Sequence, residues 1–266
     1  MAKSDNPFAI ITGTSRGIGA EYARALARQG YDLLLISRDE KRMAQFSHEL
    51  EASYGIQTHI GILDLATPGS AHELFSIAGN CYKTPDILIN NAGFGVYGKF
   101  ALQPMKQIQQ MLHLHLQTVV ESIRLFLPGM IERGGGAIIN VSSIAGMFPI
   151  PYMAEYSATK AFLISFSEAL AEEVRANGVQ IQACCPGQTE TSFHSLAGFK
   201  PKNPFPAQTT KDVVQMSLAA LKKKQTFVTI GWQGKLSSVI AKWVPKKILL
   251  KAAGQIIKKG LNKSKF

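Results

Sequence analysis

Short apolar runs alternate with longer segments of helical periodicity along most of this chain, and this alternation restricts the possible folds more than any other feature. The runs are almost entirely apolar rather than alternately apolar and polar, as expected for strands buried on both faces of a parallel sheet. The pattern predicts repeated βαβ units in a single doubly wound α/β domain with a parallel sheet of about seven strands. The expected strands are residues 8–12, 32–37, 57–62, 87–90, 137–141, 180–185 and 227–230.

Charge is distributed unevenly along the sequence. The net charge of +11 would suit a nucleic-acid-binding protein, but residues 213–266 hold 12 Lys and no Asp, Glu or Arg, whereas the rest of the chain holds 17 basic and 18 acidic side chains. A nearly neutral body with a basic tail lacks the charged patch of such a protein. We therefore expect no nucleic-acid partner.

The sequence has no recognisable segment that would direct the chain out of the cytoplasm. The apolar run at residues 8–11 is too short for a signal-peptide core, and no stretch reaches the roughly 18 apolar residues of a membrane-spanning helix. Cys81, Cys184 and Cys185 have no CxxC spacing, so we expect neither a disulfide framework nor a metal site. A cytoplasmic location is the expectation.

A glycine-rich turn, TGTSRGIG at residues 12–19, lies between the first expected strand and the first expected helix. Glycines at such a turn let the backbone approach a pyrophosphate, and the helix N-terminus offers unpaired N–H groups and a favourable dipole. The order of strand, turn and helix is that of a Rossmann-type dinucleotide fold. The expected cofactor contacts are Gly13, Ser15, Arg16, Gly17, Ile18 and Gly19.

The end of the second expected strand indicates which dinucleotide is bound. A carboxylate about 20 residues beyond the turn would bind the ribose of NAD, whereas a basic group accommodates the 2′-phosphate of NADP. Ser37 and Arg38 stand at that position, and Arg16 can approach the same phosphate from the turn. We therefore expect NADP(H). The alternative is that Arg38 is a solvated residue opening the next helix, with Asp39 as its cap.

The TGxxxGxG spacing resembles that of the short-chain dehydrogenase/reductase family, and the resemblance extends over roughly residues 8–230. It implies that Asp64 and Leu65, after the third strand, lie at the adenine. It also implies that the NNAG segment at residues 90–93 passes along the cofactor, and that the stretch at residues 186–191, similar to the family's PGxVxT, holds the nicotinamide. The implied contacts in these two segments are Asn91, Ala92, Gly93, Pro186, Gly187, Thr189 and Thr191.

Tyr156 and Lys160 are four residues apart in an expected helix, which places them on one helix face. A nearby ammonium lowers the pKa of a phenol from its usual value of about 10, so Tyr156 becomes a usable general acid. Ser143 precedes Tyr156 by the family's interval, and its hydroxyl can hold a substrate carbonyl. The resemblance implies that Tyr156 and Lys160 also lie at the nicotinamide ribose. Taken singly, a packed aromatic, a solvated lysine and a turn serine would explain these residues as well.

The family's fourth catalytic residue is an Asn that holds a water linking the lysine to solvent, and the matching position here is His115. An imidazole can accept or donate one hydrogen bond. Two interpretations stay open: either His115 takes over the relay, or it is a buried histidine without a catalytic part.

The side chains expected around Ser143 and Tyr156 are mostly apolar and include no basic anchor, which predicts a hydrophobic carbonyl substrate. The same side chains would also suit a core or a subunit interface. Within the family, the sequence is most similar to hydroxysteroid dehydrogenase-like and long-chain 3-oxoacyl reductase-like members, and the resemblance implies a homodimer or homotetramer. The expected lining is Phe94, Val96, Tyr97, Met147, Phe148, Ile150, Tyr152, Met153, Phe193, Leu196 and Phe199.

The expected Rossmann-type domain comprises residues 1–234, and residues 235–266 form a basic amphipathic extension. Residues 242–263 can be drawn as one helix that either lies on an anionic membrane surface or packs on its own domain or a sister subunit. Both interpretations stay open. The apolar side of this helix holds Trp243, Leu249, Leu250, Ala253, Ile256, Ile257 and Leu261, and the other side holds Lys247, Lys251 and Lys258.

The leading functional hypothesis is an NADPH-dependent oxidoreductase that reduces a carbonyl to an alcohol. A non-catalytic NADP-binding scaffold that docks through its tail is the alternative, but such a protein has no evident use for Ser143, Tyr156 and Lys160. A methyltransferase with a related glycine-rich turn is disfavoured by the Tyr-Lys pair and by Arg38, which replaces the acidic residue expected at the ribose.

Overall fold

The computed structural model describes residues 5–81, 84–191, 193, 197, 199 and 207–261. Within them, seven parallel strands form one sheet in the order β3-β2-β1-β4-β5-β6-β7, which confirms the predicted fold class. The strands are β1 (Phe8–Thr12), β2 (Asp32–Ser37), β3 (Thr58–Ile62), β4 (Ile87–Asn90), β5 (Gly136–Val141), β6 (Val179–Cys185) and β7 (Phe227–Thr229).

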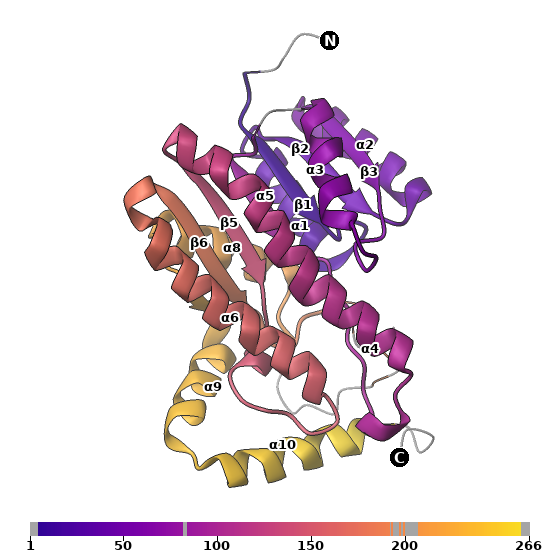
Figure 1. Ribbon diagram of the computed structural model, residues 1–266, viewed down its shortest axis with the longest axis vertical. Helices are drawn as coiled ribbons and strands as arrows, with labels where there is room; N and C mark the ends of the chain where they lie inside the picture. The colour runs from indigo at the N-terminus through magenta and orange to yellow at the C-terminus, as the bar shows by residue number, and fades with distance from the viewer. Residues whose placement is uncertain are drawn as a thin grey trace.

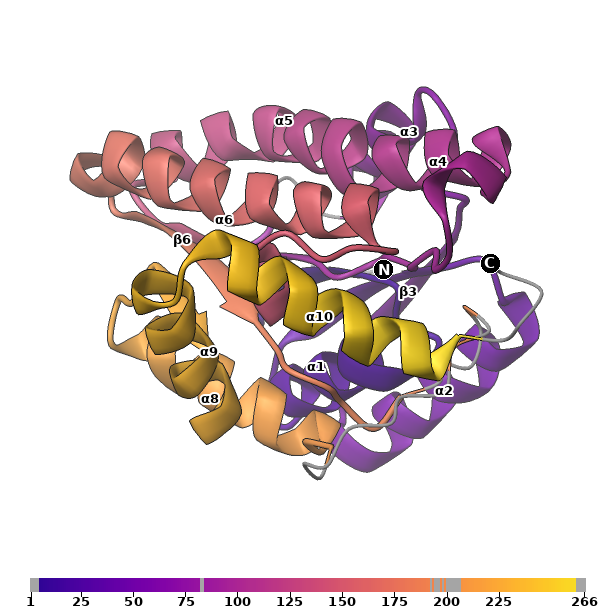
Figure 2. The same ribbon diagram turned by 90° about the horizontal axis from the view of Figure 1, so that it is seen from below.

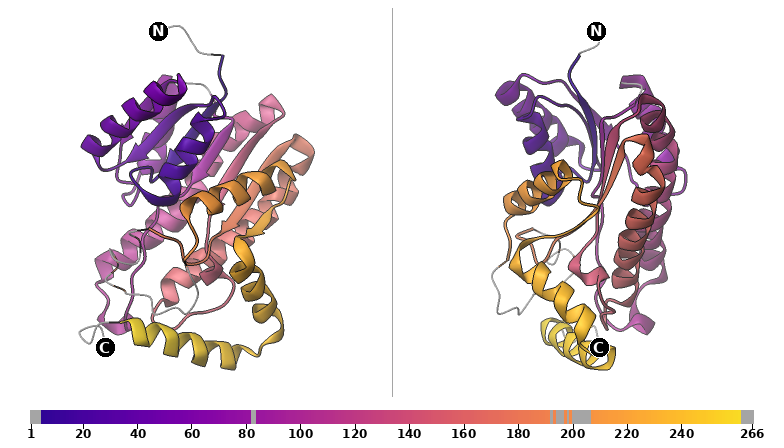
Figure 3. Two further views of the ribbon diagram at one scale, coloured as in Figure 1. Left: turned by 180° about the vertical axis from the view of Figure 1, so that it is seen from behind. Right: turned by 90° about the vertical axis from the view of Figure 1, so that its left-hand side faces the viewer.

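Helices cover both faces of the sheet, as Figures 1 and 2 show and as the edge-on view in Figure 3 makes plain. Strands β1, β2 and β4 are buried along their whole length, which is why their sequences are continuously apolar. One face carries α1 (Gly17–Ala27), α2 (Glu40–Tyr54) and α8 (Thr210–Lys222). The other carries α3 (Ser70–Cys81), α4 (Met105–Leu112), α5 (Thr118–Arg133) and α6 (Ala154–Val174).

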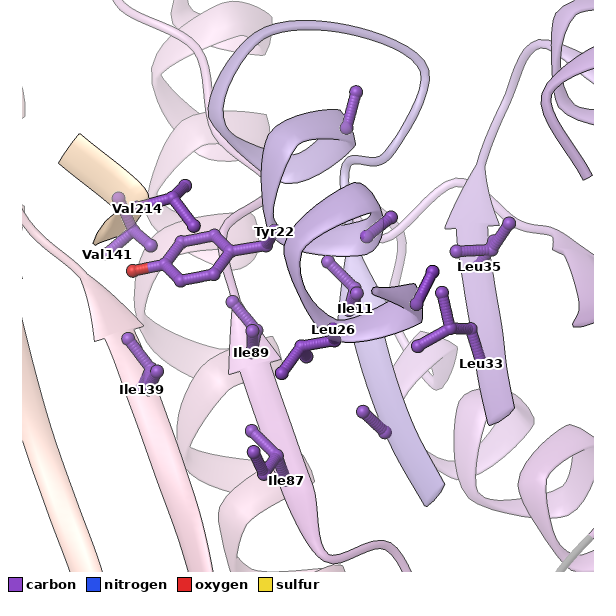
Figure 4. Close-up of a cluster of buried hydrophobic side chains, with 14 of the residues drawn as sticks. Ile11, Tyr22, Leu26, Leu33, Leu35, Ile87, Ile89, Ile139, Val141 and Val214 are labelled. Atoms are coloured by element: carbon purple, nitrogen blue, oxygen red, sulfur yellow. The ribbon is translucent and has the colours of Figure 1, made fainter. Parts of the chain in front are cut away.

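Tyr22 of α1 lies at the centre of the core on the first face, between the sheet and α8 (Figure 4). Its hydroxyl donates to Ser217 Oγ of α8 at 2.6 Å, so the one polar atom of this buried ring is satisfied. The core therefore fixes α1, whose N-terminus lies at the glycine-rich turn, against the middle of the sheet.

The chain reverses its direction of winding at β1, which lies between β2 and β4. In doubly wound folds, ligands bind in the crevice outside the carboxyl ends of the strands at this switch point. The turns that follow β1 and β4 are thus the place where a site is expected.

The predicted single tail helix over residues 242–263 is wrong. Helix α9 (Gly231–Trp243) ends before Val244, which is extended, and Pro245 caps a separate helix α10 (Lys246–Gly260). Proline has no N–H to donate and disfavours helical conformation in the residue before it, so Pro245 favours a break in the helix at Val244 and a new helix start. Lys263 lies outside the described residues, and the predicted domain boundary between residues 234 and 235 falls inside α9. Among the described residues, no helix is both long and apolar enough to span a membrane.

Candidate active site

The glycine-rich turn after β1 is bonded directly to the NNAG segment after β4. Thr12 Oγ1 accepts the backbone N–H groups of Asn91 and Ala92 at 2.9 and 3.0 Å. The Asn91 side-chain amide donates to the carbonyl oxygens of Thr12 and Gly13 at 2.8 and 3.2 Å. Two sets of predicted cofactor residues, 78 positions apart in sequence, are therefore held together at the switch point.

Two glycines of the turn cannot be replaced without moving the backbone. Gly13 has φ +72°, and a Cβ on it would lie 2.9 Å from Ala92 Cα. A Cβ on Gly19 would collide with the carbonyl oxygen of Gly13 and the side-chain amide of Asn91. Arg16, the N-cap of α1, makes no side-chain capping bond. The N–H groups at the start of α1 thus face the crevice without a side-chain cap, the arrangement that suits a pyrophosphate.

The residues predicted to choose the dinucleotide line one pocket of about 380 Å³ beside this turn. The exposed Arg38 forms an ion pair with Asp64 across the ends of β2 and β3, at 3.6 Å. Lys41, on the first turn of α2, also lines the pocket. Sequence reasoning missed it, although a second basic residue three positions after Arg38 could have indicated it. The pocket is lined by Ser15, Arg16, Ser37, Arg38, Asp39, Glu40 and Lys41.

Tyr156 and Lys160 lie on one side of α6, as predicted from their spacing, and both are buried. Lys160 Nζ lies 5.7 Å from the centroid of the Tyr156 ring and donates to the carbonyl oxygen of Val141, at the end of β5, at 2.9 Å. Ser143 begins the short 3₁₀ turn η3 (Ile144–Gly146), which follows β5 directly. The three predicted catalytic residues are therefore gathered between α6 and the end of β5.

Burial has the largest effect on the pKa values of Lys160 and Tyr156. It lowers the pKa of Lys160 to about 8. It raises the pKa of the Tyr156 phenol above its usual value, and a hydrogen bond with the Ser143 side chain offsets only part of that rise. The net shift of the phenol pKa is therefore upward, opposite to the predicted lowering, because burial is the larger effect. Lys160 Nζ is hydrogen-bonded to the carbonyl oxygen of Val141.

The η3 turn is docked on the backbone of α6 at Lys160. Ser142 Oγ donates to the Lys160 carbonyl oxygen at 2.7 Å, and a Cβ on Gly146 would lie 2.6 Å from the Lys160 carbonyl carbon. These two residues set the distance of Ser143 from α6. Sequence reasoning missed both, although the adjacent pair of serines and the glycine three residues later were the available signals.

His115 lies in one turn of π-helix, η2 (His113–Gln117), between α4 and α5, and is completely buried. The Thr159 hydroxyl donates to the Tyr156 carbonyl at 2.8 Å, so it accepts from His115 Nδ1 at 3.0 Å. His115 Nε2 then accepts the N–H of Phe94 at 3.3 Å. Burial and the charge of Lys160 hold the His115 pKa well below its usual value. The imidazole is neutral, and both ring nitrogens are used, so neither is left to hold a water.

The PGxVxT-like segment after β6 faces the glycine-rich turn. A Cβ on Gly17 would lie 3.1 Å from the methyl carbon of Thr191. Thr189 is buried, and its hydroxyl donates to the carbonyl of Gly187 at 3.0 Å. The segment is anchored by Gln208, whose side-chain oxygen accepts the N–H of Gly187 at 3.3 Å.

Tyr156 belongs to a third cluster of buried apolar side chains, distinct from the two clusters on the faces of the sheet. Phe193 packs on the phenol ring with centroids 5.6 Å apart, and Tyr97 stacks on Phe199 at 4.4 Å. Leu196 lies outside the described residues. The cluster contains most of the predicted lining and adds Met111, Ala145, Ala197, Ala253, Ile257 and Leu261, which sequence reasoning did not assign to it. Within the described residues, no group of three or more His, Cys, Asp and Glu could hold a metal ion.

Comparison with known proteins gives a consistent picture. A family model described as short chain dehydrogenase matches residues 7–198. Ketoacyl reductase HetN from Nostoc sp. is 33% identical over 256 residues, covering 93% of this chain and 84% of that protein. Human very-long-chain 3-oxoacyl-CoA reductase is 30% identical over 247 residues, covering 91% and 78%. A short-chain dehydrogenase from Sphingobium yanoikuyae, solved with NADPH, superposes with a TM-score of 0.79 at 30% identity, covering 84% and 87%.

Proposed function

Because the chain belongs to the short-chain dehydrogenase family and is thus an NAD(P)-dependent oxidoreductase, we propose that it interconverts a carbonyl and a secondary alcohol on an apolar substrate with NADP(H). One observation carries this proposal. Tyr156 and Lys160 are both buried on one side of α6, with Ser143 docked beside them, where an apolar cluster meets the switch-point crevice.

The crevice fits NADP(H) along its length. The N-terminus of α1, free of a side-chain cap, suits the pyrophosphate, and the basic pocket of Arg16, Arg38 and Lys41 suits a 2′-phosphate. When bound, the cofactor supplies the hydride. The residues proposed to hold it are Gly13, Ser15, Arg16, Gly17, Ile18, Gly19, Ser37, Arg38, Asp64, Leu65, Asn91, Ala92, Gly93, Tyr156, Lys160, Pro186, Gly187, Thr189 and Thr191. The Sphingobium neighbour, solved with NADPH, supports this choice.

The chain's own residues would then handle the proton. Ser143 Oγ donates to the substrate carbonyl oxygen and holds it at the Tyr156 hydroxyl, which gives its proton to the developing alkoxide. The ammonium of Lys160 stabilises the phenolate that remains, and with a pKa of about 8 the amine is mostly charged at pH 7. His115 is a positioning residue in this scheme, because it ties α6 at Thr159 to the backbone of Phe94.

The substrate proposed is a long acyl chain with a 3-oxo group. The cluster around Tyr156 is apolar, which suits a hydrocarbon chain. Two of the similar proteins are named ketoacyl reductase and very-long-chain 3-oxoacyl-CoA reductase. We also propose a cytoplasmic homodimer or homotetramer. The free buried thiols of Cys184 and Cys185 suit a reducing compartment, and the partly exposed Phe162, stacked on Phe166, suits a subunit contact.

The test is Tyr156→Phe assayed by loss of NADPH fluorescence against apolar ketones, steroids and 3-oxoacyl thioesters. We expect turnover to fall about 10²- to 10⁴-fold, the usual contribution of a general acid, with NADPH binding retained. Tyr54→Phe, at the far end of α2, is the matched control and should keep full activity. Equal turnover in Tyr156→Phe and the parent would refute the chemistry. NADPH binding without turnover of any compound would favour the non-catalytic scaffold.

A further inference from the structure

Helix α9 carries an exposed apolar stripe. Trp232, Leu236, Val239 and Trp243 are 55%, 43%, 55% and 82% exposed. Their spacing of i, i+4, i+7 and i+11 places all four on one helix face. A contiguous apolar face of this kind on a protein surface marks an interaction site.

Helix α10 has two faces with different environments. Leu249 and Gly254 are buried, Ala253 and Ile257 pack on the cluster around Tyr156, and Leu261, just past the helix, pairs with Phe199. This inward face confirms that the tail packs on its own domain.

The outward face of α10 is both apolar and basic. Ile248 and Ile256 are 58% and 56% exposed and stand one turn on either side of the exposed Ala252. Around them, the exposed cations are Lys246, Lys247, Lys251, Lys258 and Lys259. Packing on the domain therefore explains the apolar residues of the inward face of α10 but not those of its outward face.

Both helices lie at one end of the molecule, beyond the carboxyl ends of β5 and β6 and away from the N-terminus (Figure 1). Seen from below, α10 runs across the molecule, and α9 is beside it (Figure 2). The stripe on α9 and the outward face of α10, which together we term the basal surface, belong to a segment of the chain, residues 213–266, with 12 Lys and no Asp or Glu.

We propose that the basal surface binds an anionic lipid bilayer, with the apolar side chains in the interface and the lysines among the headgroups. Exposed apolar residues and exposed lysines occur together on these two neighbouring helices, a combination that matches such a surface in both chemistry and charge. A second copy fits less well, because a symmetric contact through the basal surface would bring the same lysines of both chains together.

Docking in this way would place α10 between the bilayer and the apolar cluster around Tyr156. An acyl-chain substrate dissolved in the bilayer would then reach the site along α10 without crossing water. This consequence, unlike the docking itself, rests on the proposed function.

The chain provides its own probe, because its two tryptophans, Trp232 and Trp243, both lie in the α9 stripe. We expect their fluorescence to shift to the blue when the full-length protein meets vesicles of phosphatidylcholine with phosphatidylglycerol, and to be quenched by brominated lipid. Vesicles of phosphatidylcholine alone should bind at least tenfold more weakly, and salt should weaken binding to the anionic vesicles. Equal binding to both vesicle types, or none to either, would overturn the proposal.

Two triple variants with the same change in net charge test whether vesicle binding depends on the position of the lysines or only on the total charge. The triple variant Lys247→Gln, Lys251→Gln, Lys258→Gln should bind anionic vesicles at least tenfold more weakly, whereas Lys222→Gln, Lys223→Gln, Lys224→Gln, at the end of α8, should bind as the parent does. An equal loss of vesicle binding in both variants would refute binding through the basal surface. A dimer with buried tryptophans and no vesicle binding would identify a second copy of the chain as the occupant. Turnover of a water-soluble ketone should be the same in the parent and in both variants. If the parent does not turn over any ketone, the proposed function fails, but the result on vesicle binding is unaffected.

Discussion

Lys160 is the residue whose protonation should control the pH dependence of the reaction. Burial lowers the pKa of its amine to about 8, so the charged form is lost as the pH rises through that value. We expect kcat/KM for carbonyl reduction to be level below about pH 7 and to fall above about pH 8. The measurement is a pH profile at limiting substrate.

Protein stability gives a check that does not involve turnover. Between about pH 8 and the usual lysine value of 10.5, the unfolded chain binds a proton at Lys160 that the folded chain does not, so the free energy of unfolding rises with pH through this window. Lys160→Met should lack that rise, which amounts to about 3 kcal/mol at most. A parallel pH dependence in parent and variant would contradict the assignment to Lys160.

His115 should matter for structure rather than for proton transfer. Since its imidazole is neutral and bonded at both nitrogens, His115→Asn, which can still donate and accept, should keep turnover within a few-fold. His115→Ala leaves a cavity and should lower the free energy of unfolding by about 2–4 kcal/mol, measured by urea denaturation. Complete loss of activity in a stably folded His115→Asn would show that the imidazole takes part in the chemistry.

Among the secondary-structure elements, the contact of η3 with α6 should be sensitive to a single methyl group. Gly146→Ala places a Cβ 2.6 Å from the Lys160 carbonyl carbon, so the turn that carries Ser143 must move away from α6. We expect a loss of about 1–3 kcal/mol of stability and about a 10- to 100-fold fall in turnover. Gly135→Ala, where a Cβ meets nothing within 4 Å, is the control, and an equal effect there would contradict the argument.

Elements that depend on local pattern were predictable, and those that depend on tertiary contacts were not. All seven strands were expected within about a residue of their ends. In β1, β2 and β4 the reason is burial on both faces, which leaves a continuous apolar run. The 3.6-residue periodicity of the tail indicates one helix, but Pro245 begins a separate helix, which the apolar pattern alone does not show. The motifs predicted that Ser143, Tyr156 and Lys160 act together, and the fold gathers them between α6 and the end of β5; their catalytic roles stay a prediction. The docking of Ser142 and Gly146 and the two hydrogen bonds of His115 join segments far apart in the sequence. The serine pair and the glycine indicate a turn, but they do not indicate which segment the turn contacts.

At the scale of the whole molecule, the cofactor should stabilise the fold, because its proposed contacts come from the ends of most strands. NADPH at 100 times its Kd adds about 2.7 kcal/mol to the free energy of unfolding, a rise in Tm of roughly 5–10 °C for a domain of this size. Differential scanning fluorimetry should show less for NADH. Arg38→Ala should bring the NADPH response down to the NADH level, and an unchanged preference would remove Arg38 from the phosphate site.

The inward face of α10 also has a consequence for biosynthesis. Residues 246–260 leave the ribosome after every strand of the sheet, yet they cover the aromatic surface next to Tyr156. A nascent chain that has already paired its strands would still expose that apolar surface to solvent and would be bound by chaperones. Enzyme maturation therefore waits for translation of this last helix, however early the sheet itself forms.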